Sequence, residues 1–554
     1  MVRTMRGARS KAFDVSGAVA DVGRAFREHG EEGALALVQA MLETLARTNA
    51  ALELDRMRLL KKHLGRTSER VTDEQLGFLF AMLPEEERPK DALVPAPAAA
   101  PLETSDNDQS DAPSAPPTGK KKGRDNHGRK PLPDSLRRVE TPLAVPAEER
   151  VCAKCGKDKV CIGHDVSEVL CFKPAELYVE RQVKEKLACP DECKGELVTA
   201  EAPERVIEKG RPDASLLAKI TVGKYDDYEP LNRQKKFFER YGVSIPVSTM
   251  VGWVAATATA LEPIAKLILK LVLDGYVVQG DDTGLKVLDE KEPGGAKRGH
   301  LWFYVADASQ CAVIYTPDWT KESAGLFVSA RKGGYLVADA YGGWDHLFTR
   351  DEHPLIEAGC WAHGRRPFVE LAERGEARAA VMLHHVKKLY EVEKAATGAN
   401  EGPAERLLRR RRDSSPIIDD IKKWIAEVQA KEPPKSALAG AVGYLDNHWT
   451  ALTRFLDDGA LPLDNTLVER ALRGVSQGRK NFLFAGSDAG AIRAATIYTI
   501  TATCRLCGVE PLAYVEDVLR KLSTGRWPYS RLRELVPDEW RKTAPASALL
   551  APKR

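Results

Sequence analysis

The chain has 554 residues, of which 43% are hydrophobic, and a formal net charge of +3 at pH 7. This length and apolar content allow more than one hydrophobic core, so we expect three or more domains. The near-neutral charge excludes a uniformly basic nucleic-acid-binding protein, but basic clusters at 120–130, 364–366 and 406–413 fit local phosphate contacts, with solvated charge runs as the alternative.

The N-terminal residues contain no apolar stretch typical of a secretory signal. The two longest apolar stretches, 261–273 and 489–509, carry lysine or arginine and are too short or too charged to span a bilayer. Both therefore predict buried helices. Without an export signal, the ten cysteines indicate a reducing compartment, where closely spaced pairs bind metal more often than they form disulfides.

A heptad repeat runs through residues 35–63, inside an N-terminal helical region that we place at 1–85. One core position holds Leu35, Leu42, Asn49 and Arg56, and the other holds Val38, Leu45, Leu52 and Leu59. An Asn at a core position lowers stability but fixes the register of a two-stranded coil. The repeat predicts a dimerisation coiled coil, with an amphipathic helix packed inside its own domain as the alternative.

Residues 86–140 predict a disordered linker with a basic end. Proline, alanine, serine and aspartate dominate up to about residue 133, a composition that buries too little apolar surface to fold. The basic end carries Arg129 and Lys130 and could lie along a DNA groove, although a flexible solvated tail is the default.

Two close cysteine pairs indicate a small zinc module at 141–200. Cys152 and Cys155 form a Cys-x2-Cys knuckle, and Cys189 and Cys193 form a Cys-x3-Cys pair. Four thiolates suit tetrahedral zinc, and the metal would stabilise a module too small for a large core. Cys161 and His164 offer a competing second half of the site.

The region 201–274 is predicted to be helical and similar to a helix-turn-helix. One helix ends near Gly242, a short turn follows, and a second helix contains Ser248 and Thr249. The second helix could enter a major groove, while Lys235 and Lys236 on the first could reach phosphates. A plain helical pair is equally compatible with the pattern.

From residue 276 the pattern changes to strands. We expect a strand ending at Asp281, a turn at Gly284, further strands at 300–309 and 311–317, a helix near 321–331 and another strand before Asp339. Strands followed by a helix and a further strand predict a mixed α/β sheet. Adjacent strand ends would bring Asp281 and Asp339 to one edge.

Paired carboxylates repel each other, and divalent metals remove that conflict. Hard oxygen ligands suit magnesium or manganese, and two metals stabilise the attacking and leaving oxygens of a phosphodiester displacement. A third carboxylate would complete the site. Glu469 is the candidate, on a helix that Asp464 and Asn465 predict to begin near residue 466. Taken alone, Glu469 also fits a surface carboxylate paired with Arg473.

Eight stretches, in order along nearly the whole chain, resemble the TnpC-type DDE transposases of the insertion-sequence-66 family. They are HLGRTSERVTDEQLGFLF (63–80), GRKPLPDSLRRVE (128–140), LNRQKKFFERYGVSIPVSTMVGWV (231–254), GDDTGLKVLD (280–289), VADAYGGWDHLF (337–348), GCWAHGRRPFVEL (359–371), LDNTLVERALRGVSQGRKNFLFAG (463–486) and GVEPLAYVEDVLRKL (508–522). The chain departs from the usual family pattern at Asp282, at Thr466 and in its Cys-x3-Cys spacing.

The resemblance implies a multidomain α/β protein with a ribonuclease-H-like catalytic core, a mixed sheet flanked by helices, at 275–364 and 455–500. It implies that Asp281, Asp339 and Glu469 are the catalytic acids that hold Mg²⁺ or Mn²⁺. The helical pattern of 365–454 predicts an insertion whose arginine run at 406–412 could contact DNA, and 501–554 a C-terminal helical region.

A Cys–His pair and one further cysteine pair are interpreted as structural. Cys360 and His363 resemble half of a metal site but have no second half nearby, so we expect a strand-to-helix junction close to DNA. Cys504 and Cys507 are expected on a buried helix face. The predicted DNA-contacting residues are Arg129, Lys130, Lys235, Lys236, Ser248, Thr249, His363, Arg365, Arg366, Arg473, Arg479 and Lys480.

The implied function is a DNA transposase that binds terminal inverted repeats and catalyses metal-dependent end cleavage and strand transfer. Alternatives are a non-catalytic DNA-binding relic and an unrelated metal nuclease of the same fold. Expected partners are double-stranded DNA, a second copy or higher oligomer and small accessory proteins of the same element, with no membrane. The expected location is the bacterial cytoplasm, in association with the nucleoid.

Overall fold

The structure is a computed structural model and describes residues 15–63, 71–92, 177, 186–187, 198–199, 204–208, 210, 212–523, 525 and 527–550. The chain forms two compact units, which we describe separately. Unit 1 comprises 1–102, 270–308 and 312–473, and unit 2 comprises 103–269, 309–311 and 474–554. No helix in the described residues is long and apolar enough to cross a membrane.

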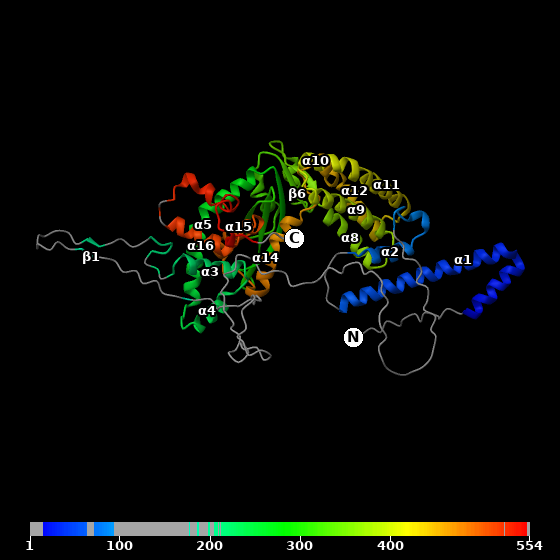
Figure 1. The fold of residues 1–554 in the computed structure, drawn as a ribbon, viewed down its shortest axis with the longest axis horizontal. Coiled ribbons are helices and arrows are strands. Elements are labelled where there is room, and N and C mark those ends of the chain that lie inside the picture. Colours follow the sequence, from blue (N-terminus) through cyan, green and yellow to red (C-terminus); the bar gives the residue numbers. More distant parts are fainter. Residues whose placement is uncertain are drawn as a thin grey trace, which may run out of the picture. The chain divides into compact units, whose positions relative to one another are not determined.

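A five-stranded mixed sheet is the centre of the α/β architecture, as predicted (Figure 1). Its strands are β3 (Val277–Leu288), β4 (Ala296–Ala306), β5 (Gln310–Thr316), β6 (Tyr335–Ala338) and β7 (Ile356–Gly359), in the order β5-β4-β3-β6-β7. β3 pairs antiparallel with β4 and parallel with β6, and β6 pairs parallel with β7. β4 is buried from Gly299 to Ala306, which fits the apolar run LWFYVA in its second half.

The expected turn at Gly284 is wrong. β3 continues through this position, where Gly284 pairs with His300 of β4. The chain turns later, between Asp289 and Gly295, where the Asp289 N–H donates to the Gly295 carbonyl. Glycine serves another purpose at 284, because a Cβ there would lie 2.7 Å from Arg298 Nε. Glycine is common in turns, but in a strand it also occurs where another group approaches the backbone closely.

Unit 1 also contains a set of helices that pack on one another and, in part, on the sheet. They are α1 (Val15–His63), α2 (Asp73–Ala81), α6 (Lys321–Gly325), α7 (Asp345–Thr349), α8 (Trp361–Glu373), α9 (Ala379–Gly398), α10 (Pro403–Arg409), a π-helical segment (Arg410–Ser414), α11 (Ser415–Lys431), α12 (Ala437–Asn447) and α13 (Trp449–Thr453). One hydrophobic core joins Val277 and Val337 of the sheet to Phe368, Leu389 and Ile421 of the helices.

The N-terminal helix α2 shares this core. Thr72 caps it and forms a capping box with Gln75, and its buried face carries Leu79 and Phe80. Charged contacts add to the apolar ones, because Lys388 Nζ lies 2.8 Å from Asp91 Oδ2. Residues 71–92 are therefore packed onto the helices that follow the sheet.

Unit 2 is helical. It contains α3 (Ala214–Tyr225), α4 (Leu231–Arg240), most of α5 (Val247–Asp274), the second half of α14 (Thr466–Phe482), α15 (Asp488–Leu506), α16 (Pro511–Ser523) and α17 (Pro537–Trp540), with the short strands β1 (Lys186–Leu187) and β2 (Val198–Thr199). α3 packs against α15 and α16, and the ring of Tyr225 meets that of Tyr498 edge-on at 5.3 Å. Cys504 and Cys507 are buried, as predicted.

Candidate active site

The sheet brings Asp281 and Asp339 to the same level. β3 and β6 are parallel neighbours, and their last paired residues are Gln279 and Val337. Asp281 lies two residues after Gln279, and Asp339 lies two residues after Val337. Because side chains alternate between the two faces of a strand, residues two apart share a face. Asp281 is still inside β3, whereas Asp339 directly follows the end of β6.

The backbone after Asp339 is strained. Ala340 has a φ of +61°, a left-handed conformation that residues with a Cβ rarely adopt. The Tyr341 N–H donates to Asp339 Oδ1 at 3.2 Å, and the Tyr444 hydroxyl donates to the Asp339 carbonyl at 3.4 Å. These contacts hold the second aspartate in a tight turn, and such strain is concentrated at functional sites.

Glu469 lies in the first turn of α14, which begins at Thr466 as predicted. Asp464 Oδ1 accepts a hydrogen bond from the Thr466 N–H at 3.0 Å, and Asp464 Oδ2 accepts one from the Tyr390 hydroxyl at 2.7 Å. The start of α14 is thereby attached to α9. The charged partner that the structure gives Glu469 is His363 rather than Arg473.

Cys360 and His363 link the end of β7 to Glu469. The Cys360 thiol donates to Asn465 Oδ1 at 3.1 Å, and His363 Nδ1 lies 3.3 Å from Cys360 Sγ. His363 Nε2 lies 3.7 Å from Glu469 Oε1 and forms an ion pair with it when the ring is protonated. Burial raises the pKa of Cys360 to about 12. This thiol is a neutral structural group at the predicted strand-to-helix junction.

The carboxylates act on one another electrostatically. Burial raises the pKa of Asp281 to about 7, and the charges of Asp339, Asp282 and Glu469 act in the same direction, against a hydrogen bond from the Asp282 N–H. Burial and the neighbouring carboxylates therefore both disfavour the ionised form of Asp281. Within the described residues, no three His, Cys, Asp or Glu side chains are arranged closely enough to hold a metal ion. The donor set itself, three carboxylates, is the chemistry that magnesium or manganese prefers.

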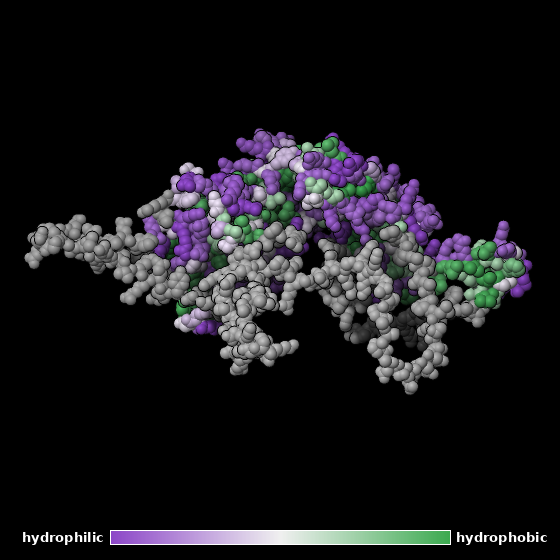
Figure 2. Space-filling view, in the orientation of Figure 1, coloured by the Kyte–Doolittle hydropathy of each residue, from purple (hydrophilic) through white to green (hydrophobic). Residues whose placement is uncertain are grey.

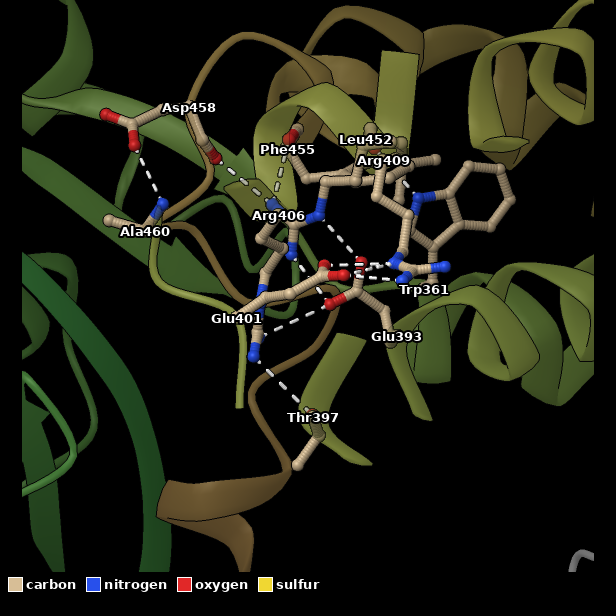
Figure 3. A network of polar contacts seen from close by, with 11 residues as sticks. Trp361, Glu393, Thr397, Glu401, Arg406, Arg409, Leu452, Phe455, Asp458 and Ala460 are labelled. Atoms are coloured by element: carbon tan, nitrogen blue, oxygen red, sulfur yellow. Dashed lines mark hydrogen bonds and ion pairs between the residues drawn. The ribbon is translucent and has the colours of Figure 1, made fainter. Parts of the chain in front are cut away.

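A network of polar contacts around Glu393 and Asp458 supports the loop before Glu469 (Figure 3). Arg410 is completely buried in the π-helical segment and forms a two-point ion pair with Glu393 of α9, at 2.6 and 2.8 Å. Its Nη1 donates to the carbonyls of Phe455 and Asp458 at 2.9 and 3.1 Å. Asp458 in turn accepts from the Tyr276 hydroxyl at 2.6 Å, just before β3. The arginine connects α9, the loop and the start of the central strand.

Most of the arginine run at 406–412 is thus engaged within the chain. Arg409 Nε donates to both carboxylate oxygens of Glu401, at 3.0 and 2.9 Å. Arg406 Nη1 lies 3.5 Å from Glu393 Oε2, and Arg412 pairs with its neighbour Asp413 at 2.7 Å. Because these guanidinium groups pair with carboxylates of the same chain, they give little support to a DNA contact through this run.

The other predicted DNA-contacting residues are distributed over both units. In unit 1, Arg365 and Arg366 lie in the first turns of α8, and Arg473 is exposed on α14. In unit 2, Lys236 and Ser248 are exposed on α4 and at the start of α5, Lys235 and Thr249 are partly exposed, and Arg479 and Lys480 are in the last turn of α14. Arg129, Lys130 and the four predicted zinc ligands Cys152, Cys155, Cys189 and Cys193 lie outside the described residues, as do Cys161 and His164.

No pattern in the sequence identified some of the side chains that lie around the acids. His300 Nδ1 lies 2.5 Å from Asp282 Oδ2, and the Trp319 Nε1–H donates to Asp282 Oδ1 at 3.3 Å. His300 is diagonal to Asp282 across the β3–β4 ladder, so a strand register would have identified that pair. Trp319 and Tyr390 come from distant segments, and no local pattern places them here.

Family models match four parts of the chain. Residues 209–493 match the "Transposase IS66 family" and residues 499–537 the "IS66 C-terminal element". Residues 149–194 match the "zinc-finger binding domain of transposase IS66", and residues 54–141 match "Transposase C of IS166 homeodomain". These matches include the segments of all three acids and of the cysteine pairs.

Relatives from Sinorhizobium fredii extend over most of the chain. The uncharacterized protein y4qI is 32% identical over 531 residues, which are 92% of this chain and 90% of the relative. The uncharacterized protein y4hP is 32% identical over 446 residues, 76% of this chain and 79% of the relative. With the family models, these similarities show that the chain belongs to the IS66 family of transposases.

Proposed function

We propose that this transposase cleaves DNA at the ends of its element and joins those ends to target DNA in a metal-dependent reaction. The catalytic residues are Asp281, Asp339 and Glu469, in a core formed by 275–364 and 455–500 and interrupted by the helical insertion 365–454. The observation that carries the proposal is the electrostatic coupling of three carboxylates from β3, the end of β6 and the first turn of α14.

The fold of the core supports this proposal. The first strand of the sheet, β3, is central, with β4 antiparallel on one side and β6 parallel on the other. We propose that this arrangement is a ribonuclease-H-like core. The central strand β3, the end of β6 and the later helix α14 then provide one acid each.

The acids would hold Mg²⁺ or Mn²⁺ through their carboxylate oxygens. Bound there, the metal would activate the attacking hydroxyl and stabilise the leaving oxygen. Asp281 loses its proton before it can act as a ligand, because its pKa is about 7. His363 orients the Glu469 carboxylate, and Asn465 and Cys360 hold His363 in place. The zinc assigned to Cys152, Cys155, Cys189 and Cys193 would be structural.

DNA binding is proposed to use the α4–α5 pair as a helix-turn-helix. The first helix ends at Arg240 and the second begins at Val247, so six residues separate them. Ser248, Val251 and Gly252 face solvent at the start of α5, and a Cβ at Gly252 would meet nothing within 4 Å. A helix whose start is exposed and carries small side chains can fit into the major groove of DNA.

Self-association is proposed to use α1. This helix is interrupted at Gly30, and its second part carries the heptad. Leu35, Leu42, Leu45 and Leu52 are between 48% and 63% exposed, and Figure 2 shows hydrophobic side chains at the surface of α1. The opposite face is covered by its own chain, since Ala50 and Leu54 are buried. An exposed apolar heptad supports pairing with a second copy.

A plasmid assay tests the catalytic proposal. Purified protein is mixed with a supercoiled plasmid carrying the inverted repeats that flank its gene, and end cleavage and strand transfer are measured with Mg²⁺ or Mn²⁺. We expect Glu469→Gln to lower both products about 10³-fold, because metal coordination supplies several kcal/mol of transition-state stabilisation.

The matched control is Glu534→Gln, which removes a charge from an exposed carboxylate paired with Arg531. This variant should retain full activity. Equal activity of wild type and Glu469→Gln would remove Glu469 from the catalytic residues. End binding without products from wild type, in every metal, would favour a non-catalytic relic.

A further inference from the structure

Three aromatic rings form a continuous stack beside the acids. The Trp319 indole lies parallel to the His300 ring, with centroids 5.6 Å apart and planes 15° apart. It also lies parallel to the Tyr341 ring, at 4.9 Å and 9°. Trp319 is therefore in contact with both of the other rings. We call His300, Trp319 and Tyr341 the aromatic wall.

The wall is attached to the acid site at two points. The Trp319 Nε1–H donates to Asp282 Oδ1, next to Asp281, and the Tyr341 N–H donates to Asp339 Oδ1. Successive side chains of a strand point to opposite faces, so Asp282 and Asp281 face different sides of β3. The Trp319 indole therefore contacts the carboxylate that follows Asp281 in β3, and Tyr341 lies two residues after Asp339, bonded to its carboxylate.

The loop that carries Trp319 is rigidly held on both sides. Before it, the Trp302 Nε1–H donates to Thr316 Oγ1 at 2.8 Å, and the Thr316 hydroxyl donates to the Asp318 carbonyl at 2.8 Å. After it, Thr320 caps α6 by accepting from the Ser323 N–H at 3.2 Å. The left-handed turn at Ala340 positions Tyr341 in the same way. Such fixed supports pre-organise a binding surface.

Trp319 remains 51% exposed although it contacts two rings and donates a hydrogen bond. His300 is only 5% exposed, so the solvent-facing part of the wall is the indole with the half-buried Tyr341. A large, rigid and exposed aromatic surface beside a DNA-processing site suits a flat ligand. In the interior of a duplex both faces of each base are covered by its neighbours, so at an uncut junction only an unstacked base can lie on such a ring.

We propose that Trp319 and Tyr341 stack an unpaired nucleobase of the DNA end next to the scissile phosphate. This proposal rests on the proposed function, because it assigns a substrate state to the same site. The chain then acts on ends whose base pair at the junction is open. The base lies on the indole, and Asp282 holds the indole orientation through the Nε1–H.

The experiment measures binding without catalysis. Glu469→Gln protein is titrated with labelled repeat-end DNA in Ca²⁺, with anisotropy as the readout. The junction pair is mismatched, so that one base is free, and is compared with the same DNA carrying an abasic site at that position. Each of the nucleotides around the junction is tested in turn.

We expect the protein to bind the base-bearing end about 10-fold more tightly than the abasic end at one position. Adding Trp319→Ala should abolish this preference and leave affinity for the abasic end unchanged, and Trp319→Phe should retain part of it. Tyr341→Ala is the second variant, so that misfolding of one does not decide the outcome. Tyr529→Ala, at a 79% exposed ring in the C-terminal region, is the control and should keep the full preference.

Equal binding of base-bearing and abasic ends at every position would overturn the stacking proposal. A preference that survives both Trp319→Ala and Tyr341→Ala would overturn it as well. Either result leaves the catalytic proposal intact if wild type cleaves the plasmid. Conversely, a Trp319-dependent preference without plasmid cleavage would support the wall and contradict catalysis. A protein that binds no repeat-end DNA would overturn both.

Discussion

Two clusters of charged side chains in unit 1 differ in how their charges are compensated. In the cluster around Arg410, the buried guanidinium meets both oxygens of Glu393 and two backbone carbonyls. In the cluster around Asp281, burial raises the pKa of Asp281 to about 7, and the nearby carboxylates of Asp339, Asp282 and Glu469 act in the same direction. One set of charges is satisfied within the chain, and the other is not.

This difference separates a structural role from a functional one. A buried ion pair with all of its hydrogen bonds made fixes the positions of the elements that carry it. Like charges held together near a strained turn destabilise the free protein and persist where a ligand relieves them. Composition left the arginine run open between a DNA contact and a solvated helix end, whereas ion pairs within the chain engage Arg406, Arg409 and Arg410.

The largest effect is expected from breaking the compensated cluster. Arg410→Met should lower the free energy of unfolding by about 3–5 kcal/mol, because it removes the two-point partner of Glu393, which keeps only Arg406 at 3.5 Å, and the donor to the Phe455 and Asp458 carbonyls. Chemical denaturation followed by circular dichroism measures this loss. The double variant Arg410→Met with Glu393→Leu should recover much of it, since neither charge remains. A single variant as stable as wild type would contradict the assigned structural role.

The uncompensated cluster should respond with the opposite sign. The folded-state pKa of Asp281 is about 7, above its ordinary value of 3.8, so ionisation of Asp281 opposes folding as the pH rises between these values. Asp281→Asn should therefore raise the free energy of unfolding at pH 8, by at most about 4 kcal/mol. The gain should disappear near pH 4. Unfolding curves at several pH values test this, and a gain independent of pH would contradict it.

Divalent metal should relieve the same repulsion. At ten times its dissociation constant, Mg²⁺ should stabilise the protein by about 1.4 kcal/mol. At one fixed Mg²⁺ concentration, the stabilisation should be larger at pH 8 than at pH 6, because binding at pH 6 must displace a proton from Asp281. Thermal unfolding with and without Mg²⁺ measures it, with Glu469→Gln as the variant that should lose most of the shift. Equal shifts at both pH values would exclude Asp281 as a ligand.

The parts of the site that depend on local patterns were predictable from the sequence. The apolar strands before Asp281 and Asp339 and the capping residues before Glu469 identify three elements independently. The turn assigned to Gly284 failed because ladder pairing with His300 outweighs the local preference of glycine for turns.

The parts that depend on ion pairing within the fold and on packing between distant segments were not predictable. Arg410 appears in the sequence as one of four consecutive arginines, and only its burial against Glu393 and Phe455 distinguishes it. Similarly, His300 and Trp319 carry no motif, and the stretch 337–348 that contains Tyr341 gives no sign that its ring meets Trp319. The three rings meet because a strand register, a capped loop and a strained turn converge on Asp282.

The smallest effect is expected at the exposed end of the arginine run. Arg412 is 70% exposed and pairs only with Asp413 in the described ion pairs, and exposed pairs of this kind contribute little. Arg412→Ala should change the free energy of unfolding by less than about 0.5 kcal/mol. Its DNA affinity should also retain the wild-type salt dependence, because a lost phosphate contact would reduce the slope by about one. A reduced slope with unchanged stability would return this residue to the DNA-binding surface, and would show that compensation by a neighbour does not exclude a functional role at an exposed position.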